Sequence, residues 1–203
     1  MRPTAGIPAT AALLVVVLLA GGCAAPPASA PGTPTGAPAV AGQSATPAGT
    51  PSASGPFNGT DIAWLQLTVA MHERVLPLLE LVPERTAQPD VRRLAAQVRD
   101  TSRTELDRSR RLLDRSGAPK TNPHEGHDMP GMVTAAELTA LGAAPDAEFR
   151  RLFGRHLRAH LEQSVRVASA EQRSGADPDT TTLAGTIART GNAYLAELTE
   201  LQP

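Results

Sequence analysis

The chain has 203 residues, of which 41% are hydrophobic and 2% aromatic, and its formal net charge is −1. The basic residues are interspersed among acidic ones, so the charge distribution gives no electrostatic basis for nucleic-acid binding. The single cysteine excludes a disulfide within the chain. The length leaves room for one folded domain after the N-terminal region is set aside.

The N-terminal region has the pattern of an export signal. Arg2 precedes an apolar run from Ala11 to Ala20, which is followed by Gly21-Gly22-Cys23. The run is shorter than the roughly 20 apolar residues of a membrane-spanning helix, and it ends in the small residues of a cleavage site. A cysteine at this point matches the bacterial lipobox, although a lone buried thiol is the alternative. We therefore predict a lipoprotein signal peptide over residues 1–22 and lipidation of Cys23, which would anchor the chain on the extracytoplasmic face of the cell membrane.

Residues 23–56 form the next segment. They are almost entirely Ala, Pro, Gly, Ser and Thr and include no charged residue. Such a composition cannot bury enough apolar surface to fold, so we predict a disordered tether that holds the folded part away from the membrane. The folded domain is then assigned to residues 57–203.

Four stretches of the folded part have apolar residues at helical spacing, and none alternates as a strand would. The expected helices cover about residues 60–82, 89–116, 145–173 and 178–201. They make two hairpins, 57–117 and 145–203, joined by a linker over residues 118–144. Four long helices with short connections inside each pair predict an all-α fold, a four-helix bundle.

An internal repeat supports the bundle. A shift of 89 residues aligns the two hairpins without a gap. The aligned pairs include Trp64 with Phe153, Glu73 with Glu162, Pro89-Asp90 with Pro178-Asp179, Leu94-Ala95 with Leu183-Ala184, and Leu106 with Leu195. Chance identity between Ala-rich helices is the alternative, but the paired Pro-Asp at both second-helix starts favours two duplicated hairpins.

The linker contains residue types that bind transition metals. His124, His127, Asp128, Met129 and Met132 lie within nine residues of a loop that Pro and Gly keep from forming a regular helix. Thioether and imidazole together suit Cu(I), whereas imidazole with carboxylate suits Cu(II) or Zn(II). A flexible loop would bind weakly on its own, because ordering it costs conformational entropy. The alternative is a polar linker that is merely rich in these residues.

A second group of candidate ligands lies on the helices. His156 and His160 are four residues apart, so they project from one face of the third long helix and toward the core. Glu105 lies on the inward stripe of the second helix, and His72 lies at the edge of the apolar face of the first. A bundle core with His156, His160, Glu105 and His72 could hold one metal ion. The alternative is a set of hydrogen-bonded core residues or histidines at a wet bundle end.

These residues resemble a known family over about Asp61 to Leu201. The segment His127-Asp128-Met129-Pro130-Gly131-Met132, followed by Thr134 and Glu137-Leu138, is similar to a His-Asp-Met-Pro-Gly-Met segment of the bacterial domain of unknown function number 305. The resemblance implies a ferritin-like bundle of two duplicated helical hairpins, with a His-His pair on the first helix of each hairpin and an acidic residue on the second.

This chain departs from the family pattern at several of those positions. The two pairs read Met71-His72 and His160-Leu161, and the acidic position is kept as Glu105 but replaced by Tyr194 in the second hairpin. Some family members look like periplasmic copper-binding proteins that use Met and His. That role transfers only to His72, His160, Glu105 and the linker, because His156 matches no family histidine.

The sequence therefore predicts an exported, membrane-anchored lipoprotein that binds a transition metal, with copper the expected ion, for buffering or transfer. The alternative is a metal-free helical module that acts in interaction or structure at the cell surface. We expect no enzymatic activity, because the Glu-x-x-His motif of di-iron proteins, a phosphate-binding glycine loop and a Cys-His pair are all missing from the sequence. The sequence leaves the protein partner and the oligomeric state open, a homo-oligomer included.

Overall fold

The structure is a computed structural model that describes residues 55–201. The predicted signal peptide, Cys23 and nearly all of the predicted tether lie outside the described residues. No helix within residues 55–201 is both long enough and apolar enough to cross a membrane.

The described residues form five helices and no strand, which confirms the predicted all-α class. The helices are α1 (Gly59–Arg85), α2 (Pro89–Ser116), α3 (Ala135–Ala143), α4 (Asp146–Ser174) and α5 (Pro178–Leu201). The four long helices correspond to the four expected ones. Proline in the first turn of α2 and α5 favours these starts, because its missing N–H is not needed there.

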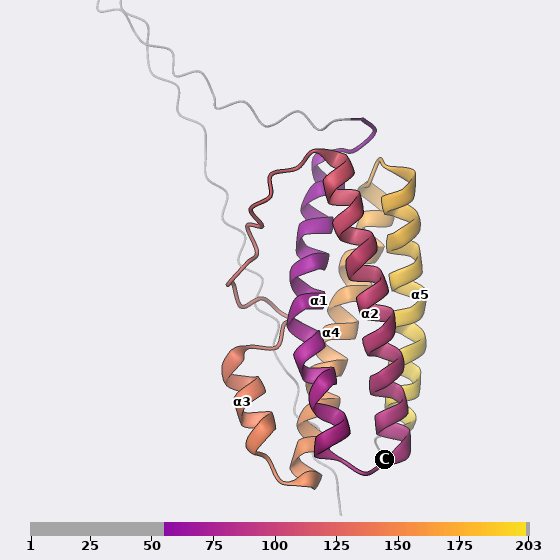
Figure 1. Cartoon of the computed structure of the whole chain (residues 1–203). Helices are drawn as coiled ribbons and strands as arrows, with labels where there is room; N and C mark the ends of the chain where they lie inside the picture. Colours follow the sequence, from indigo (N-terminus) through magenta and orange to yellow (C-terminus); the bar gives the residue numbers. More distant parts are fainter. Residues whose placement is uncertain (1–54, 202–203) are drawn as a thin grey trace, which may run out of the picture. The chain divides into compact units, whose positions relative to one another are not determined.

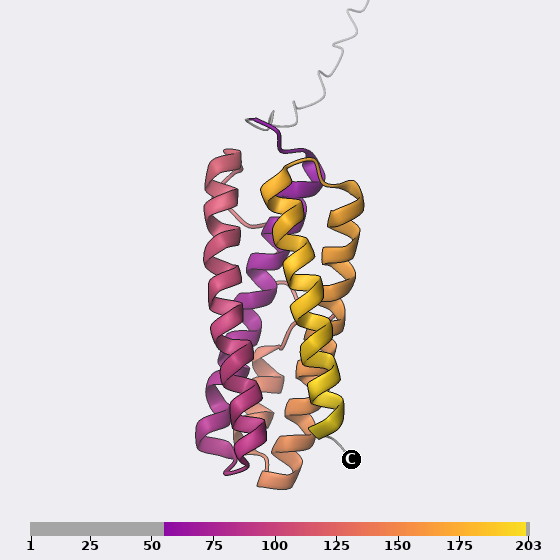
Figure 2. The same ribbon diagram turned by 90° about the vertical axis from the view of Figure 1, so that its right-hand side faces the viewer.

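The four long helices pack as two antiparallel hairpins (Figure 1). Helix α1 pairs with α2 and α4 pairs with α5, and the hairpins meet where α1 contacts α4 and α2 contacts α5 (Figure 2). Each hairpin turn has only three residues, 86–88 or 175–177, so the two helices of a hairpin must lie side by side. The arrangement is the expected four-helix bundle.

Helix α3 was not expected from the sequence, which had placed only a linker between the hairpins. It begins with a capping box: Thr134 Oγ1 accepts from the backbone N–H of Glu137 at 3.1 Å, and Glu137 Oε2 accepts from the backbone N–H of Thr134 at 2.9 Å. The Thr-x-x-Glu pattern was the available signal. The helix has only nine residues, and it packs on α1 and α4 at one end of the bundle (Figure 1).

The core consists of the apolar stripes that the sequence had indicated. The buried apolar residues of these stripes include Trp64, Met71, Val75, Leu78, Val82, Leu94, Val98, Leu112, Phe149, Phe153, Leu183, Ile187 and Leu198. Phe149 and Phe153 stack with ring centroids 6.1 Å apart. Burial of these side chains is the main term that holds the helices together, at about 1.5 to 3 kcal/mol for each large apolar side chain.

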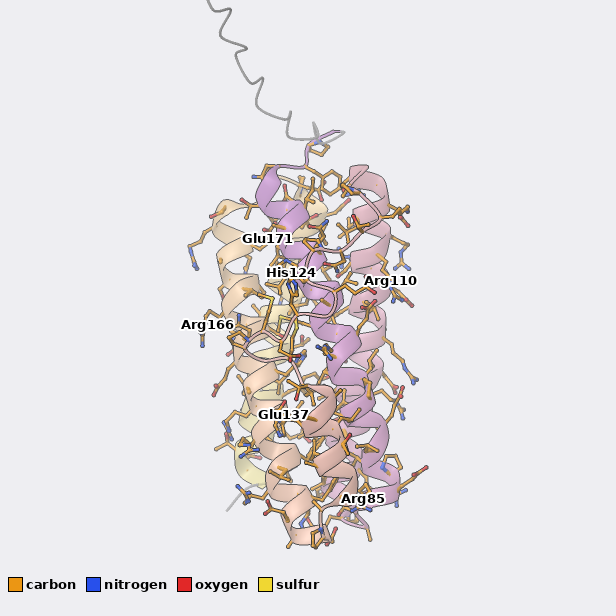
Figure 3. The ribbon with its side chains drawn as sticks, turned by 90° about the vertical axis from the view of Figure 1, so that its left-hand side faces the viewer. Arg85, Arg110, His124, Glu137, Arg166 and Glu171 are labelled. Carbon is orange, nitrogen blue, oxygen red and sulfur yellow. The ribbon has the colours of Figure 1, made fainter. Side chains whose placement is uncertain are left out.

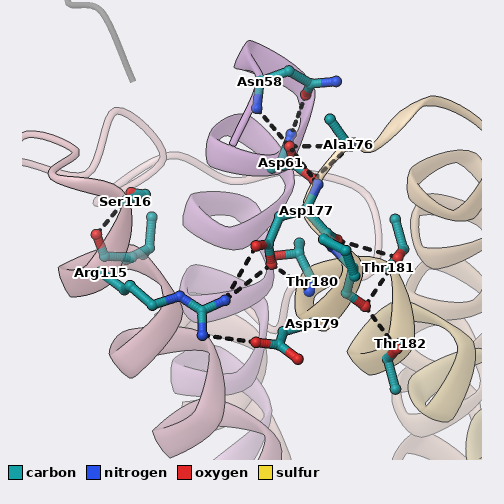
Figure 4. A network of polar contacts seen from close by, with 12 residues as sticks. Asn58, Asp61, Arg115, Ser116, Ala176, Asp177, Asp179, Thr180, Thr181 and Thr182 are labelled. Atoms are coloured by element: carbon teal, nitrogen blue, oxygen red, sulfur yellow. Dashed lines mark hydrogen bonds and ion pairs between the residues drawn. The ribbon is translucent and has the colours of Figure 1, made fainter. Parts of the chain in front are cut away.

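A buried carboxylate joins the two hairpins at the end of the bundle where α1 begins. Asp61 accepts hydrogen bonds from the backbone N–H groups of Asn58 at 2.6 Å, Ala176 at 3.1 Å and Asp177 at 3.2 Å (Figure 4). The first donor belongs to the N-terminus of α1 and the other two to the turn between α4 and α5. Asp61 therefore caps its own helix and fastens the second hairpin to it.

Glu171 lies beside this carboxylate and is only 1% exposed. Neither of its carboxyl oxygens accepts a hydrogen bond from a described donor. Burial, followed by the nearby Asp61 and Asp177, raises the pKa of Glu171 to about 8. At neutral pH Glu171 therefore keeps its proton, and as a neutral acid it can donate a hydrogen bond to Asp61.

We expect Glu171 to make the protein less stable as the pH rises. Its pKa is 4.5 in the ordinary case and about 8 in the folded protein, so between these values the folded state holds a proton that the unfolded chain has released. The stabilisation from that proton is complete below about pH 4.5 and is lost as the pH rises to about 8. Glu171→Gln removes the ionisation. The melting temperature of the variant should therefore exceed that of the wild type by an amount that grows between about pH 5 and about pH 8.

Glu162→Gln on the exposed face of the same helix is the matched control. Its melting temperature should differ from that of the wild type by a small amount that does not change with pH. A constant difference for Glu171→Gln would contradict a raised pKa at that position.

Candidate metal centre

Three ionisable side chains from three helices meet near the middle of the bundle. His72 of α1, His160 of α4 and Glu105 of α2 are 3%, 2% and 7% exposed. His72 Nε2 lies 3.5 Å from Glu105 Oε2, and the centroids of the two imidazole rings are 5.9 Å apart. The helical stripes had placed Glu105 and His160 inward and His72 at the edge of an apolar face, and the packing of the hairpins brings them together.

These side chains line a cavity of about 20 Å³, which is large enough for one water molecule. The same cavity is lined by Thr101, Thr190 and Tyr194. Thr190 Oγ1 donates to Glu105 Oε1 at 3.3 Å, and Thr101 Oγ1 lies 2.7 Å from the Tyr194 hydroxyl.

The two hydrogen bonds are equivalent under the internal repeat. The 89-residue shift places Thr101 on Thr190 and Glu105 on Tyr194. In one bond the threonine comes from the second hairpin and Glu105 from the first. In the other bond the threonine comes from the first hairpin and Tyr194 from the second. The replacement of the second carboxylate by Tyr194 keeps this bond but removes one anionic ligand from the centre.

Burial sets the charge of these groups. It lowers the pKa of His72 to about 3, with a smaller effect from His160, and lowers the pKa of His160 to about 4. Burial also raises the pKa of Glu105 to about 7. Both imidazoles are therefore neutral at physiological pH, the form that binds metal ions. The Nδ1 atoms of His72 and His160 have no hydrogen-bond partner among the described residues.

A cluster of methionines lies next to the two histidines. Met71 and Met132 are 2% and 7% exposed and pack together, with half-buried Met129 against them. Met71 and His72 also share the lining of a second cavity of about 10 Å³ with Ser164, whose Oγ lies 3.5 Å from His160 Nε2. Met71 thus lies beside His72 in this lining, and Met129 and Met132 pack on Met71. We refer to Met71, Met129 and Met132 as the methionine cluster.

The methionine cluster forms because the linker is docked on the bundle, where a free loop had been expected. The Asn122 side chain donates to the backbone carbonyl of Gln66 at 2.8 Å, and Arg74 donates to Asp128 at 2.7 Å. Figure 3 shows the linker lying over α1 and α4, with His124 on it and sulfur atoms close by. These contacts, which no spacing in the sequence could reveal, turn Met132 inward.

Gly131 allows the close approach of the linker to α4. Its φ is +82°, in the left-handed region that favours glycine. A Cβ atom at this position would lie 2.6 Å from the Gln163 Cβ and 3.0 Å from the Ala159 carbonyl oxygen, both of α4. Any other residue would push the segment that contains Met129 and Met132 away from the histidines.

The remaining predicted ligands lie elsewhere. His127 is exposed, His124 is half-buried, and Asp128 is engaged by Arg74. His156 lies beside α3, where its Nδ1 is 3.7 Å from Glu137 Oε1, and it does not line the cavity that His72, His160 and Glu105 share. The structure therefore brings His72, His160 and Glu105 together and packs Met129 and Met132 on Met71. It leaves His127 exposed and His156 beside α3.

Hard ligands alone do not make a metal site in residues 55–201. No group of three or more His, Cys, Asp or Glu side chains there is arranged to hold an ion. The methionine thioethers add possible soft ligands, because Cu(I) is a soft ion that accepts sulfur and imidazole ligands. The residues present therefore fit Cu(I) better than Zn(II) or Cu(II).

Met71 is the candidate ligand that sequence reasoning missed, since it was assigned only to the apolar stripe of the first helix. The 89-residue shift aligns Met71 with His160. This alignment was the available signal, because it pairs one metal-binding residue type with another at equivalent positions of the two hairpins.

The fold and the centre define a duplicated four-helix bundle with histidine, glutamate and methionine side chains buried between its hairpins. Residues 61–202 match the family Domain of unknown function (DUF305), and the chain belongs to this family. The resemblance found in the sequence is thereby confirmed. No curated protein matches the chain.

Several solved structures share the fold. A DUF305 fragment from Deinococcus radiodurans is 24% identical with a TM-score of 0.65, and the match covers 72% of this chain and 97% of that one. A DUF305 protein from Streptomyces coelicolor that is inferred to be secreted is 21% identical with a TM-score of 0.64, over 70% of this chain and 91% of that one. CopM in the Cu(I)-bound form is 19% identical with a TM-score of 0.59, over 71% of this chain and 96% of that one. At these identities the likeness establishes the fold alone.

Docking of the linker predicts a role for Met132 in the stability of the metal-free protein. Met132→Ala should lower the free energy of unfolding by about 2 to 3 kcal/mol, because it leaves a cavity beside Met71. Met132→Leu nearly conserves volume and should cost less than about 1.5 kcal/mol. Urea unfolding followed by circular dichroism measures both. A Met132→Ala variant as stable as the wild type would mean that the linker is not held on the bundle.

Proposed function

We propose that this protein is an exported, non-enzymatic copper-binding protein that holds Cu(I) for buffering or transfer. The observation that carries the proposal is the burial of the methionine cluster beside two neutral histidines. Met71, Met129 and Met132 would supply thioether ligands, and His72 or His160 would supply an imidazole. The bound ion would be a cargo, so no reacting group is required at the site.

The chemistry of the ligands supports copper in its reduced form. Thioether sulfur is a soft ligand that selects Cu(I) over the harder divalent ions, and neutral imidazole is compatible with it. CopM, a protein of the same fold, has been solved in both Cu(I)-bound and Cu(II)-bound forms. Family membership and this relative make copper a better candidate than another soft ion.

Attachment to the membrane is the second part of the proposal. The residues around Cys23 have the lipobox pattern, and a family member from Streptomyces coelicolor is inferred to be secreted. A lipidated Cys23 would place the copper site outside the cytoplasmic membrane, at the end of the tether over residues 23–56. Stable anchoring by acyl chains would not require a membrane-spanning helix.

A metal-free interaction module is the alternative function. Two observations favour it: Tyr194 stands where a second carboxylate would be, and the described residues contain no preformed cluster of hard ligands. Under this alternative the buried polar groups would serve only to fix the register of the helices. Copper titration separates the two functions.

The copper experiment compares leucine and alanine variants of the metal-free protein, without a His tag. Met71→Leu, Met129→Leu and Met132→Leu combined should keep the core packed while removing all three sulfur atoms. The affinity for Cu(I), measured anaerobically against a competing chromophoric chelator, should fall at least about tenfold. His124→Ala with His127→Ala should change it far less, because His127 is exposed and His124 is only half-buried.

Thermal unfolding of the same proteins locates the ion. Cu(I) bound only by the folded state should stabilise the wild type by about 2.7 kcal/mol at a free concentration of 100 times Kd, and the leucine variant should show little of this gain. Loss of binding in the His124→Ala and His127→Ala variant alone would move the site to the surface of the linker. Failure of the wild type to take up any Cu(I) or Cu(II) would leave the interaction module as the function.

The lipid anchor has its own test. Cys23→Ala should release the protein into the medium or leave an unprocessed precursor, because the thiol is the acylation point. Detergent phase partitioning of labelled cells measures this, with Ser44→Ala in the tether as the control that should remain in the detergent phase. Equal partitioning of the wild type and Cys23→Ala would contradict lipidation.

A further inference from the structure

A groove of about 630 Å³ lies at the end of the bundle opposite Asp61 and Glu171. Its walls come from the first turns of α2 and α4 and from the last turn of α5. The groove is remote from the methionine cluster, and none of the residues that line it belongs to the copper site. Its volume is in the range of small-molecule binding sites, about 300 to 1,000 Å³.

Unequal helix lengths create this groove. Helix α4 has 29 residues, whereas α5 has 24 and ends at Leu201. Figure 2 shows that α5 ends before it reaches the level at which α4 and α2 meet the lower end of the bundle. The inner faces of the first turns of α4 and α2 are therefore not covered by α5.

The floor of the groove is apolar. Phe153, Val91 and Leu198 line it, and each belongs to the hydrophobic core with an exposed fraction of 2%, 8% or 2%. Half-buried Leu201 completes the floor at its open side. A ligand on this floor would bury its own apolar surface against side chains that are already held in place by the core.

Arginines from α4 surround the floor. The lining includes Arg150, Arg151, Arg155 and Arg158 and contains no Asp or Glu. Arg150 and Arg151 form ion pairs with Asp146 and Glu148 of their own helix. Such exposed pairs contribute at most about 1 kcal/mol and exchange readily for another anion. The Arg155 guanidinium contacts His156 at 3.3 Å, and its charge makes a minor contribution to lowering the pKa values of Glu137 and Glu148, without a hydrogen bond to either.

We infer that this groove binds a small amphipathic anion, a molecule with one carboxylate or phosphate group and an apolar chain. Guanidinium groups match the planar, bidentate geometry of carboxylate and phosphate oxygens, and the apolar floor takes the chain. Neither half of the site would select such a ligand alone. Together, the arginines select against neutral molecules, and the apolar floor selects against inorganic anions, which have no apolar chain to bury.

Decanoate is a suitable probe, and isothermal titration calorimetry on the copper-free folded protein, below the concentration at which the probe forms micelles, measures its binding. Octanoate should bind more weakly than decanoate by up to about fifteenfold, because two methylenes fewer are buried. Decanol should bind more weakly than decanoate, and decyltrimethylammonium should not bind detectably. Equal affinity for decanoate and decanol would overturn the role of the arginines.

Matched variants connect the binding to the groove. Arg151→Gln with Arg155→Gln should weaken decanoate binding about tenfold, whereas Arg103→Gln with Arg110→Gln, which changes the net charge equally outside the groove, should leave it within about twofold. Leu201→Asp should abolish binding by placing a carboxylate on the floor, and Leu201→Asn should weaken it far less.

The same proteins added to vesicles that contain an anionic phospholipid test the competing explanation of a flat membrane-binding surface. The proposal would be overturned if the protein bound vesicles but not decanoate, and if the two double arginine-to-glutamine variants weakened vesicle binding equally. Absence of decanoate binding to the folded wild type would do the same.

Discussion

The burial of His72, His160 and Glu105 between the hairpins is the constraint on which the rest of the structure depends. A buried polar group without a partner costs about 1 to 3 kcal/mol, and the Nδ1 atoms of both histidines lack one among the described residues, so the polar contacts that do form carry weight. The 3.5 Å contact between His72 and Glu105 joins α1 to α2, and the bond from Thr190 to Glu105 joins α2 to α5. These contacts tie α1, α2 and α5 to one another, and the His72 ring, 5.9 Å from that of His160, adds α4.

The linker completes this centre from outside. Its docking by Asn122 and Asp128, together with the left-handed Gly131, places Met132 against Met71 at the α1 and α4 interface. The methionines pack against one another in the metal-free state, and under the proposed function they would provide soft ligands for Cu(I). The same side chains would thus serve packing and binding, which is why leucine rather than alanine is the informative replacement.

The two ends of the bundle have different physical characters. At one end, Asp61 fastens the second hairpin through backbone N–H groups of the turn between α4 and α5, with the buried Glu171, whose pKa is raised, beside it. At the other, the short α5 leaves an apolar floor that arginines surround. The first end resists opening at neutral and acidic pH, whereas the second offers a surface that is already formed before any ligand arrives.

The sequence by itself determined the fold class, the four long helices and the inward positions of Glu105 and His160, because apolar spacing and an 89-residue repeat can be read along the chain. It also contained the Thr134 capping box and the alignment of Met71 with His160, although neither was used. Only the tertiary structure decided which of the candidate ligands meet. His156 faces Glu137 of α3, whereas Met132 turns inward, because contacts between residues far apart in the chain set these directions and no periodicity records them.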